Sequence, residues 1–561
     1  VVGELQGLLG FVRQEQGRVD EAIAALRQAV VANPRQYDAL TRLAQLLVTA
    51  GKVGEAVDIF RQAVALRPAQ AGAHSNLANA LHLHGQAEEA MAEYRRAIEL
   101  DPRFVGAHVN LGLALSQVGR PDEALPILER ALELQPNNAE AWNNLGGVYS
   151  ALGRTRDCEQ AFRRALELRP DYPEAWNNLG NALHSQLRLD EAASCFSRAI
   201  ELRPNYPEAH SNSGNVLFAM GRREAAAAAY RRAVELRPSY GDAWHNFGLL
   251  HQHAGKVGEA IDCYRQALKF KPEEAGIACE LAHQLQHECR WGDELMRLEK
   301  QVVAAVEADE LDSLTTPIPP FAFICLPTPA SPQLHLRCAR QWAARLSREH
   351  GPANAAMARG PKFAGPTRAE DRKLVIGYLS ADFHSHATAW LAAELFESHD
   401  RKQFSIHAYS YGPDETSAMR QRLVAAFDRF VDVREMSFDG AARAIEADGV
   451  DILVDLKGYT RDSRSEILAR RPAPIQVNYL GYPGTMGADF IDYALVDEII
   501  APAAEQACYS ERLVQLPGCY QVNDSRREVS SRPWTRQECG LPAEGVVLCC
   551  FNNSFKITPE L

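Results

Sequence analysis

The strongest constraint on the fold is a set of prolines that recur every 34 residues through the first half of this 561-residue chain. The eight positions are Pro34, Pro68, Pro102, Pro136, Pro170, Pro204, Pro238 and Pro272. A fixed period of this length is typical of helix–turn–helix units, each of which buries its apolar face against its neighbours. The sequence therefore predicts an α-helical solenoid in this half of the chain.

The residues inside each unit indicate which repeat this is. The unit at 139–172 carries Trp142, Leu145, Gly146, Tyr149, Phe162, Ala165 and Pro170, and the next unit repeats this pattern. These landmarks resemble the tetratricopeptide repeat. Small residues let paired helices approach, large ones fill the seam, and glycines end the first helix of a unit; these are Gly119, Gly153, Gly221 and Gly255. We count nine units over residues 3–308, the last without its proline.

One polar position repeats within these units. Asparagine occupies it in six consecutive units, at Asn76, Asn110, Asn144, Asn178, Asn212 and Asn246, and Arg42 and Glu280 interrupt the series at either end. The position lies about 200° around the helix from Trp142 or Trp176, away from the seam. One interpretation is a ladder of carboxamides that binds the backbone of an extended peptide. The other is that each Asn bonds the neighbouring repeat.

Composition narrows the function classes. A net charge of −12 argues against general nucleic-acid binding. No apolar run reaches the ~18 residues of a membrane helix, and no signal peptide opens the chain. The twelve Cys include no C-x-x-C pair or other metal-ligand spacing. We expect a cytoplasmic protein with reduced thiols, no bound metal, no membrane association and an oligomeric state that the sequence does not reveal.

After a Pro-rich connector (309–370) with one helix, Gln333–His350, the chain alternates between strand-like and helix-like runs. We expect strands at Leu374–Leu379, Phe404–Tyr409, Ile452–Leu456, Ile475–Tyr479, Tyr493–Val496 and Leu513–Leu516. Helices are expected at about Thr388–Ser398, Ser417–Phe427, Phe438–Ala447 and Ser463–Ala469. This alternation predicts a parallel sheet covered on both faces over residues 371–540.

Two loops at the ends of predicted strands are the expected site, because ligands bind at the carboxyl ends of strands in open α/β sheets. The first contains Asp382, His384 and His386 and leads to Thr388. A histidine there could move a proton, with Asp382 orienting it; alternatively, Asp382 and Thr388 simply cap the loop and helix.

The second loop has Gly481, Gly484 and Gly487, where backbone amides could approach a ligand. Between the two loops, Arg464 and Glu466 are expected to form a structural ion pair. At the end of the chain, a predicted strand at Val546–Phe551 opens a further α/β unit, 541–561.

These features together carry a family resemblance. Tetratricopeptide units followed by Gly377-Tyr-Leu-Ser-Ala-Asp-Phe383, Arg471-Pro-Ala-Pro-Ile-Gln476 and Leu480-Gly-Tyr-Pro-Gly-Thr485 closely resemble protein O-linked N-acetylglucosamine transferases, including the bacterial ones. The resemblance implies two Rossmann-like lobes of the GT-B type, the second nearly absent here. It also implies inverting, metal-free transfer of N-acetylglucosamine from the donor UDP-GlcNAc to Ser or Thr hydroxyls of proteins, without a cofactor.

The resemblance also implies roles for single residues. His386 matches the active-site histidine, and Asp382 matches an acid proposed for proton transfer. Thr388 matches a residue near the sugar–diphosphate. Asn553 matches a polar residue near the nucleotide, and Lys556 matches a lysine that neutralises the diphosphate leaving group, where a fixed cation would stabilise the developing negative charge.

The turn at Leu480 and Gly481 matches one that lines the substrate. The chain departs from the family pattern at Ser385 and Ala387, which stand where Asn and Pro are usual. In addition, the stretch Pro320–Leu326 has no counterpart of the second histidine found in eukaryotic members.

Two other functions stay open. The chain could be a tetratricopeptide scaffold with an inactive lobe, or a related transferase that uses another UDP-hexose or an Asn acceptor. We expect weak UDP binding and negligible turnover from these 561 residues alone.

Overall fold

A computed structural model describes residues 2–308, 316–327, 331–351 and 372–526, together with 532, 535–538 and 544. The chain divides into two compact units, Val1–Pro238 and Ser239–Leu561. Within the described residues, no helix combines the length and apolar character needed to cross a bilayer.

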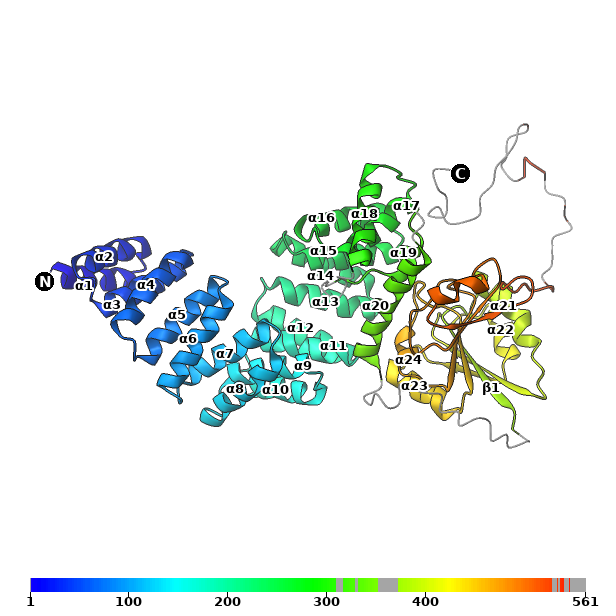
Figure 1. The fold of residues 1–561 in the computed structure, drawn as a ribbon, viewed down its shortest axis with the longest axis horizontal. Helices are drawn as coiled ribbons and strands as arrows, with labels where there is room; N and C mark the ends of the chain where they lie inside the picture. The colour runs from blue at the N-terminus through cyan, green and yellow to red at the C-terminus, as the bar shows by residue number, and fades with distance from the viewer. Residues whose placement is uncertain are drawn as a thin grey trace. The chain divides into compact units, whose positions relative to one another are not determined.

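The first unit consists of antiparallel helix pairs, each packed against the next (Figure 1). The helices are α1 (Val2–Glu15), α2 (Val19–Ala32), α3 (Tyr37–Thr49), α4 (Val53–Leu66), α5 (Ala71–Leu83), α6 (Ala87–Leu100), α7 (Val105–Gln117), α8 (Pro121–Leu134), α9 (Ala139–Ala151), α10 (Thr155–Leu168), α11 (Pro173–Ser185), α12 (Leu189–Leu202), α13 (Pro207–Ala219) and α14 (Arg223–Leu236). The predicted helical repeat is confirmed.

Turn glycines let each pair reverse direction. Gly119, Gly153 and Gly221 adopt φ values of 75°, 70° and 73°, in the left-handed region that glycine enters without strain. In the unit that begins at Pro173, Leu187 occupies the equivalent place with φ 59°. The turn therefore keeps its geometry even where the repeat lacks glycine.

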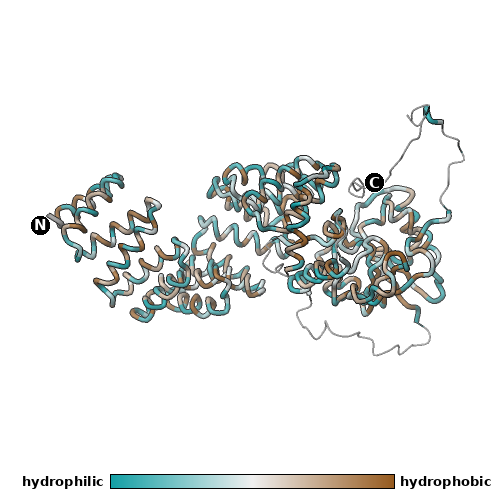
Figure 2. Tube along the Cα trace, turned by 45° about the horizontal axis from the view of Figure 1, so that its top comes forward, coloured by the Kyte–Doolittle hydropathy of each residue, from teal (hydrophilic) through white to brown (hydrophobic). Residues whose placement is uncertain are grey.

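A glycine on the first helix of a pair makes room for a large side chain on the second. A Cβ added to Gly146 would lie 2.6 Å from the Phe162 ring, and one added to Gly180 would lie 2.7 Å from the Phe196 ring. Both rings are buried. Hydrophobic and hydrophilic segments alternate along these helices (Figure 2), as expected for helices with one buried face.

This close approach predicts opposite effects at two adjacent glycines of α9. Gly146→Ala should destabilise the protein by about 1–3 kcal/mol, because the new methyl group overlaps the Phe162 ring. Gly147→Ala meets no atom within 4 Å and should stabilise α9 by about 0.5–1 kcal/mol through helix propensity. Urea unfolding followed by circular dichroism measures both. Equal effects would contradict the packing described for this seam.

The second unit begins with two more helix pairs, α15 (Gly241–His253), α16 (Val257–Phe270), α17 (Ala275–His287) and α18 (Asp293–Ala308). Residues 316–327 cover α17. The backbone N–H of Thr316 donates to Glu274 at 3.0 Å, and Gln286 donates to the carbonyl of Cys325 at 2.6 Å. The connector is thus packed against the last repeat.

Two helices lead from the repeats to the sheet. The short α19 (Pro320–Ile324) is a second connector helix, where the sequence analysis expected one. It tolerates the Pro-rich sequence because proline is at its first position, where the missing N–H is not needed. Helix α20 (Pro332–His350) confirms the predicted connector helix and contacts both α18 and α24 (Ser465–Ala469).

The lobe is built on a parallel sheet of order β3-β2-β1-β4-β5-β6-β7. Its elements are β1 (Leu374–Ser380), α21 (Ala387–Glu397), β2 (Phe404–Ser410), α22 (Ala418–Ala426), β3 (Arg429–Asp432), α23 (Phe438–Ala447), β4 (Ile452–Asp455), β5 (Ile475–Asn478), β6 (Tyr493–Val496), the 3-10 helix η2 (Ala503–Cys508) and β7 (Arg512–Gln515). All six strands predicted over residues 371–540 are present. The edge strand β3 was not predicted.

Side chains that alternate along each strand pack against helices on opposite faces of the sheet. Leu379, Tyr409 and Leu453 contribute to a core with α20, α23 and α24. Their neighbours Tyr378, Ala408 and Val454 contribute to a second core with α21 and α22. The carboxyl edge of the sheet is left for the loops.

Candidate active site

The loop after β1 brings Asp382, His386 and Thr388 together. His386 is the N-cap of α21, and its Nδ1 accepts a hydrogen bond from the Thr388 backbone N–H at 3.2 Å. The Thr388 hydroxyl donates to Asp382 Oδ2 at 3.2 Å, and this oxygen lies 3.5 Å from His386 Nδ1. The side chain that caps α21 is therefore His386, and not Asp382 or Thr388 as the alternative interpretation expected.

Lys457 completes this cluster. Its Nζ donates to both carboxylate oxygens of Asp382, at 3.0 and 3.2 Å, and both residues are buried. The sequence prediction missed this residue. A usable signal was present, because Lys457 directly follows the predicted strand Ile452–Leu456, and the carboxyl ends of parallel strands lie at one edge of a sheet.

Asp455, at the end of β4, holds the loop that carries Lys457. Its carboxylate accepts the backbone N–H groups of Lys457 at 3.1 Å and Gly458 at 2.9 Å. Burial is the main cause that raises the pKa of Asp455 to about 7. These two hydrogen bonds fix the backbone of Lys457 and Gly458 directly after β4.

The pKa of His386 is shifted below its ordinary value. Partial burial is the main cause; Asp382 raises the pKa, while Lys457 and His384 lower it. The imidazole is therefore mainly neutral at pH 7.

The loop after β4 lies between the two predicted loops and contacts both. A Cβ on Gly481 would lie 2.1 Å from the carbonyl oxygen of Leu456, one residue before Lys457. Gly481 thus provides space for the protein's own backbone. Leu480 is buried with φ 73°, so this turn has a strained residue at its start. The structure brings Asp382, His386, Thr388, Leu480 and Gly481 to one edge of the sheet.

Other predicted residues lie elsewhere. Asn553 and Lys556, like the strand Val546–Phe551, lie outside the described residues. The predicted ion pair between Arg464 and Glu466 is wrong as stated: Arg464 donates to the carbonyls of Val433 and Met436, both at 2.7 Å. Because it ties the β3–α23 segment to α24, its role is structural, as expected. No group of three or more possible metal-ligating side chains occurs among the described residues.

The six ladder asparagines are half-buried on the first helix of each pair. Asn110 donates to Asn79 at 2.9 Å, Asn178 to Asn143 at 3.1 Å, and Asn212 to Asn177 at 3.0 Å. Each of these bonds joins neighbouring repeats. Asn110, Asn178 and Asn212 therefore make the contact that the second interpretation predicts, a bond to the neighbouring repeat. Glu280, at the next ladder position, is buried, and burial raises its pKa to about 7.

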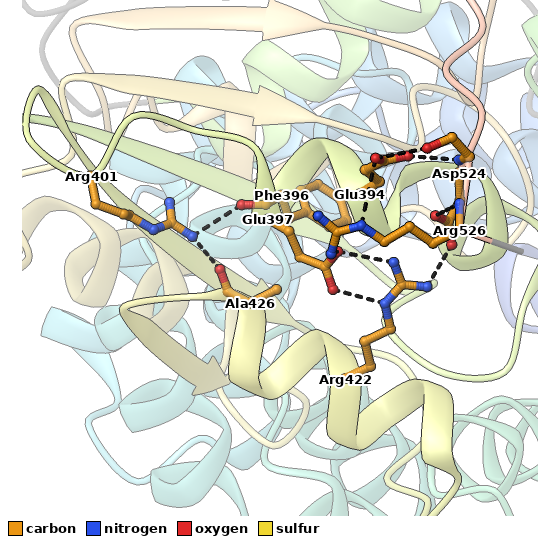
Figure 3. Close-up of polar contacts among 9 residues, drawn as sticks. Glu394, Phe396, Glu397, Arg401, Arg422, Ala426, Asp524 and Arg526 are labelled. Carbon is orange, nitrogen blue, oxygen red and sulfur yellow. Dashed lines mark hydrogen bonds and ion pairs between the residues drawn. The ribbon is translucent and has the colours of Figure 1, made fainter.

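A network of ion pairs fixes α21, the helix that begins at His386 (Figure 3). The Arg422 guanidinium donates to Glu397 at 2.8 and 2.9 Å and also pairs with Asp524, which follows β7. Glu394 accepts the backbone N–H and hydroxyl of Ser525 at 2.6 and 2.9 Å. The chain after β7 is thereby tied to the exposed face of the helix that carries the site.

Loss of the central arginine of this network should be costly. Arg422→Gln removes the paired hydrogen bonds to Glu397 and the ion pair with Asp524, and should lower the free energy of unfolding by roughly 1–3 kcal/mol. Arg443→Gln is the matched control, because the pair of Arg443 with Asp439 is more exposed, and should change stability by less than about 0.5 kcal/mol. Denaturant unfolding measures both. A loss no larger for Arg422→Gln would contradict the role of the network.

The fold and site together define a class: a tetratricopeptide repeat protein that carries a parallel α/β lobe with a polar cluster at the carboxyl edge of its sheet. Family models agree with this division. Residues 289–531 match glycosyl transferase family 41, and tetratricopeptide models match residues 9–71, 78–119, 115–179, 173–206 and 212–275.

Comparison with individual proteins gives a narrower class than the family models. The chain is 36% identical over 293 residues to the probable UDP-N-acetylglucosamine–peptide N-acetylglucosaminyltransferase SEC of Arabidopsis thaliana, covering 50% of this chain and 29% of the relative. It is 37% identical over 154 residues to the Caenorhabditis elegans UDP-N-acetylglucosamine–peptide N-acetylglucosaminyltransferase, covering 27% of this chain and 13% of the relative. The resemblance to protein O-linked N-acetylglucosamine transferases is thus confirmed, and the chain spans less than a third of these relatives.

Among solved structures, an O-GlcNAc transferase mutant of Thermobaculum terrenum is similar at 25% identity and a TM-score of 0.33. The match covers 68% of this chain and 58% of that one.

Proposed function

We propose that this chain is the repeat region and first catalytic lobe of a protein N-acetylglucosaminyltransferase. The proposed reaction transfers N-acetylglucosamine from UDP-GlcNAc to Ser or Thr hydroxyls, with inversion and without a metal or cofactor. The observation that carries the proposal is the Asp382–His386–Lys457 cluster, which lies at the carboxyl edge of the sheet inside the segment that matches family 41. We also propose a cytoplasmic location.

The cluster has the chemistry that such a transfer needs. The attacking hydroxyl must lose a proton, and the sugar and diphosphate oxygens need hydrogen-bond donors as negative charge develops. His386 is partly exposed and can contact a ligand, whereas Asp382 and Lys457 are buried behind it. In this proposal His386 and Thr388 face the reacting sugar, and Asp382 acts from behind them. Lys556 and Asn553 would supply the diphosphate and nucleotide contacts.

This proposal predicts a strong effect at His386. In the natural polypeptide that contains these 561 residues, His386→Ala should lower kcat/KM for transfer to a Ser/Thr peptide by roughly 100-fold or more, because the oxygens of the reacting donor lose a hydrogen-bond donor. His399→Ala is the matched control, because His399 lies just beyond the other end of α21, and should stay within about two-fold of the unmodified protein. Transfer of radiolabel from UDP-GlcNAc gives the rates. Equal activity of the two variants would contradict the assignment, and preference for UDP-glucose would favour the related-transferase alternative.

We propose further that the repeats hold protein acceptors in extended form, with the asparagine ladder contacting the peptide backbone. Three ladder amides also bond neighbouring repeats through their Nδ2 groups. An amide oxygen has two lone pairs, so these residues keep capacity to accept a bond from a peptide N–H. A second candidate, a binding scaffold without catalysis, rests on the same repeats and predicts peptide binding without transfer.

Replacing Asn144, Asn178 and Asn212 with Ala should raise KM for a protein acceptor about ten-fold, as expected from the loss of a few backbone hydrogen bonds. Hydrolysis of UDP-GlcNAc without acceptor should not change. The control replaces Asn33, Asn137 and Asn205, which are exposed and lie in connections between helices. Circular dichroism on the same samples separates lost binding from lost repeat stability. An unchanged KM in a folded triple variant would rule out the peptide contact.

A further inference from the structure

Two neighbours compete for one ring nitrogen of His386. The Thr388 backbone N–H donates to Nδ1 at 3.2 Å, which requires that Nδ1 carry no proton. Asp382 Oδ2 lies 3.5 Å from the same nitrogen and could accept a bond only if Nδ1 were protonated. Both bonds cannot form at once. The neutral ring therefore has its proton either on Nε2, with the helix cap formed, or on Nδ1, directed at the carboxylate.

The surroundings of Asp382 favour the first arrangement. Lys457 Nζ already donates to both of its oxygens, and the Thr388 hydroxyl donates to Oδ2. The lysine ammonium balances the carboxylate charge within the buried cluster, so little attraction is left for a proton on Nδ1. The Thr388 N–H, in contrast, belongs to the first turn of α21, where backbone donors have no partner within the helix.

We propose that Lys457 is a positioning residue that fixes the tautomer of His386. By pairing with Asp382, it leaves Nδ1 as the acceptor of the Thr388 N–H and places the ring proton on Nε2. Neutral His386 would then present a hydrogen-bond donor to an oxygen of a bound ligand. It could not take the proton of an attacking hydroxyl at Nε2. The identity of that ligand rests on the proposed function, but the tautomer does not.

Four other titratable groups lie around the cluster. His384 lies on the same loop, with its ring centre 5.5 Å from that of His386. Glu415, beyond β2, accepts the backbone N–H of Ser385 at 2.6 Å. Tyr411 is half-buried and Asp455 is buried. Burial is the main cause that raises the pKa of each, and the charge of Asp382 raises both further. None of these four donates to Asp382 in the described contacts, whereas Lys457 does.

The sign of the pH effect follows from this arrangement. Burial and Lys457 lower the pKa of His386, while Asp382 raises it. Removing the lysine charge alone leaves Asp382 as an unbalanced acceptor beside Nδ1, which should favour a protonated ring. Removing both charges should leave the ring neutral and capped by Thr388.

Histidine-labelled protein tests this by nitrogen-15 NMR, with the His386 signal assigned by its loss in His386→Gln. Unmodified protein and Lys457→Arg should both show the Nε2–H tautomer at pH 8. Lys457→Gln should shift the proton to Nδ1 and raise the pKa of His386 by about one pH unit or more. The double variant Asp382→Asn with Lys457→Gln should keep the Nε2–H tautomer and the low pKa.

An Nδ1–H tautomer in the unmodified protein, or an unchanged tautomer and pKa in folded Lys457→Gln, would overturn the proposal. Should Lys457→Gln not fold, Asp382→Asn alone still decides: the pKa of His386 should then fall further, since the lysine charge stays and the carboxylate charge is lost. A rise would overturn it. Because no sugar or acceptor is present, a failed transferase assay and a failed tautomer test are independent results.

Discussion

The buried ion pair between Lys457 and Asp382 joins the ends of β1 and β4, and the site depends on it. Removing two charges from water is unfavourable, and their attraction compensates only when the geometry is good and the remaining polar atoms are bonded. Here both carboxylate oxygens of Asp382 accept hydrogen bonds from the Lys457 ammonium, and Oδ2 also accepts one from the Thr388 hydroxyl. The pair is satisfied only if the loop after β1, the start of α21 and the loop after β4 are all in place. It therefore specifies their relative positions.

The parallel sheet explains why these groups meet. All seven strands point the same way, so the segments after β1, β4 and β5 emerge at one edge. Asp455 holds the middle segment by accepting two backbone N–H groups. That segment contacts its neighbours on both sides, through Lys457 toward Asp382 and through the Leu456 carbonyl toward Gly481. The loop after β4, which the sequence analysis did not predict as part of the site, therefore connects the two predicted loops, those after β1 and β5.

Most of the fold could be predicted because its signals are local. The seam residues and the buried strands each follow from a few neighbouring residues, and the proline period is a regular spacing along the chain. Strand β3 was missed because charged residues occupy both of its ends, so that Phe430 and Val431 are its only apolar residues. It also pairs only with β2, at the edge of the sheet. Arg464 was paired with the nearest acid in sequence, but a guanidinium can equally bond carbonyls brought close by the fold. Such partners depend on tertiary contacts, which no local pattern contains.

The asparagine series makes structural contacts that are compatible with its proposed role in peptide binding. In the first unit its bonds form a directed path, in which Asn212 donates to Asn177, Asn178 donates to Asn143, and the longer 3.5 Å contacts from Asn177 to Asn178 and from Asn143 to Asn144 join them. At the end of this path, the Asn144 amide nitrogen has no hydrogen-bond partner among the described residues. Stacking neighbouring repeats thus orients the carboxamides before any ligand binds. An oriented amide loses less side-chain entropy on binding than a free one, so the contacts that stabilise the repeats also favour the proposed peptide contact, and the two interpretations of the series are compatible.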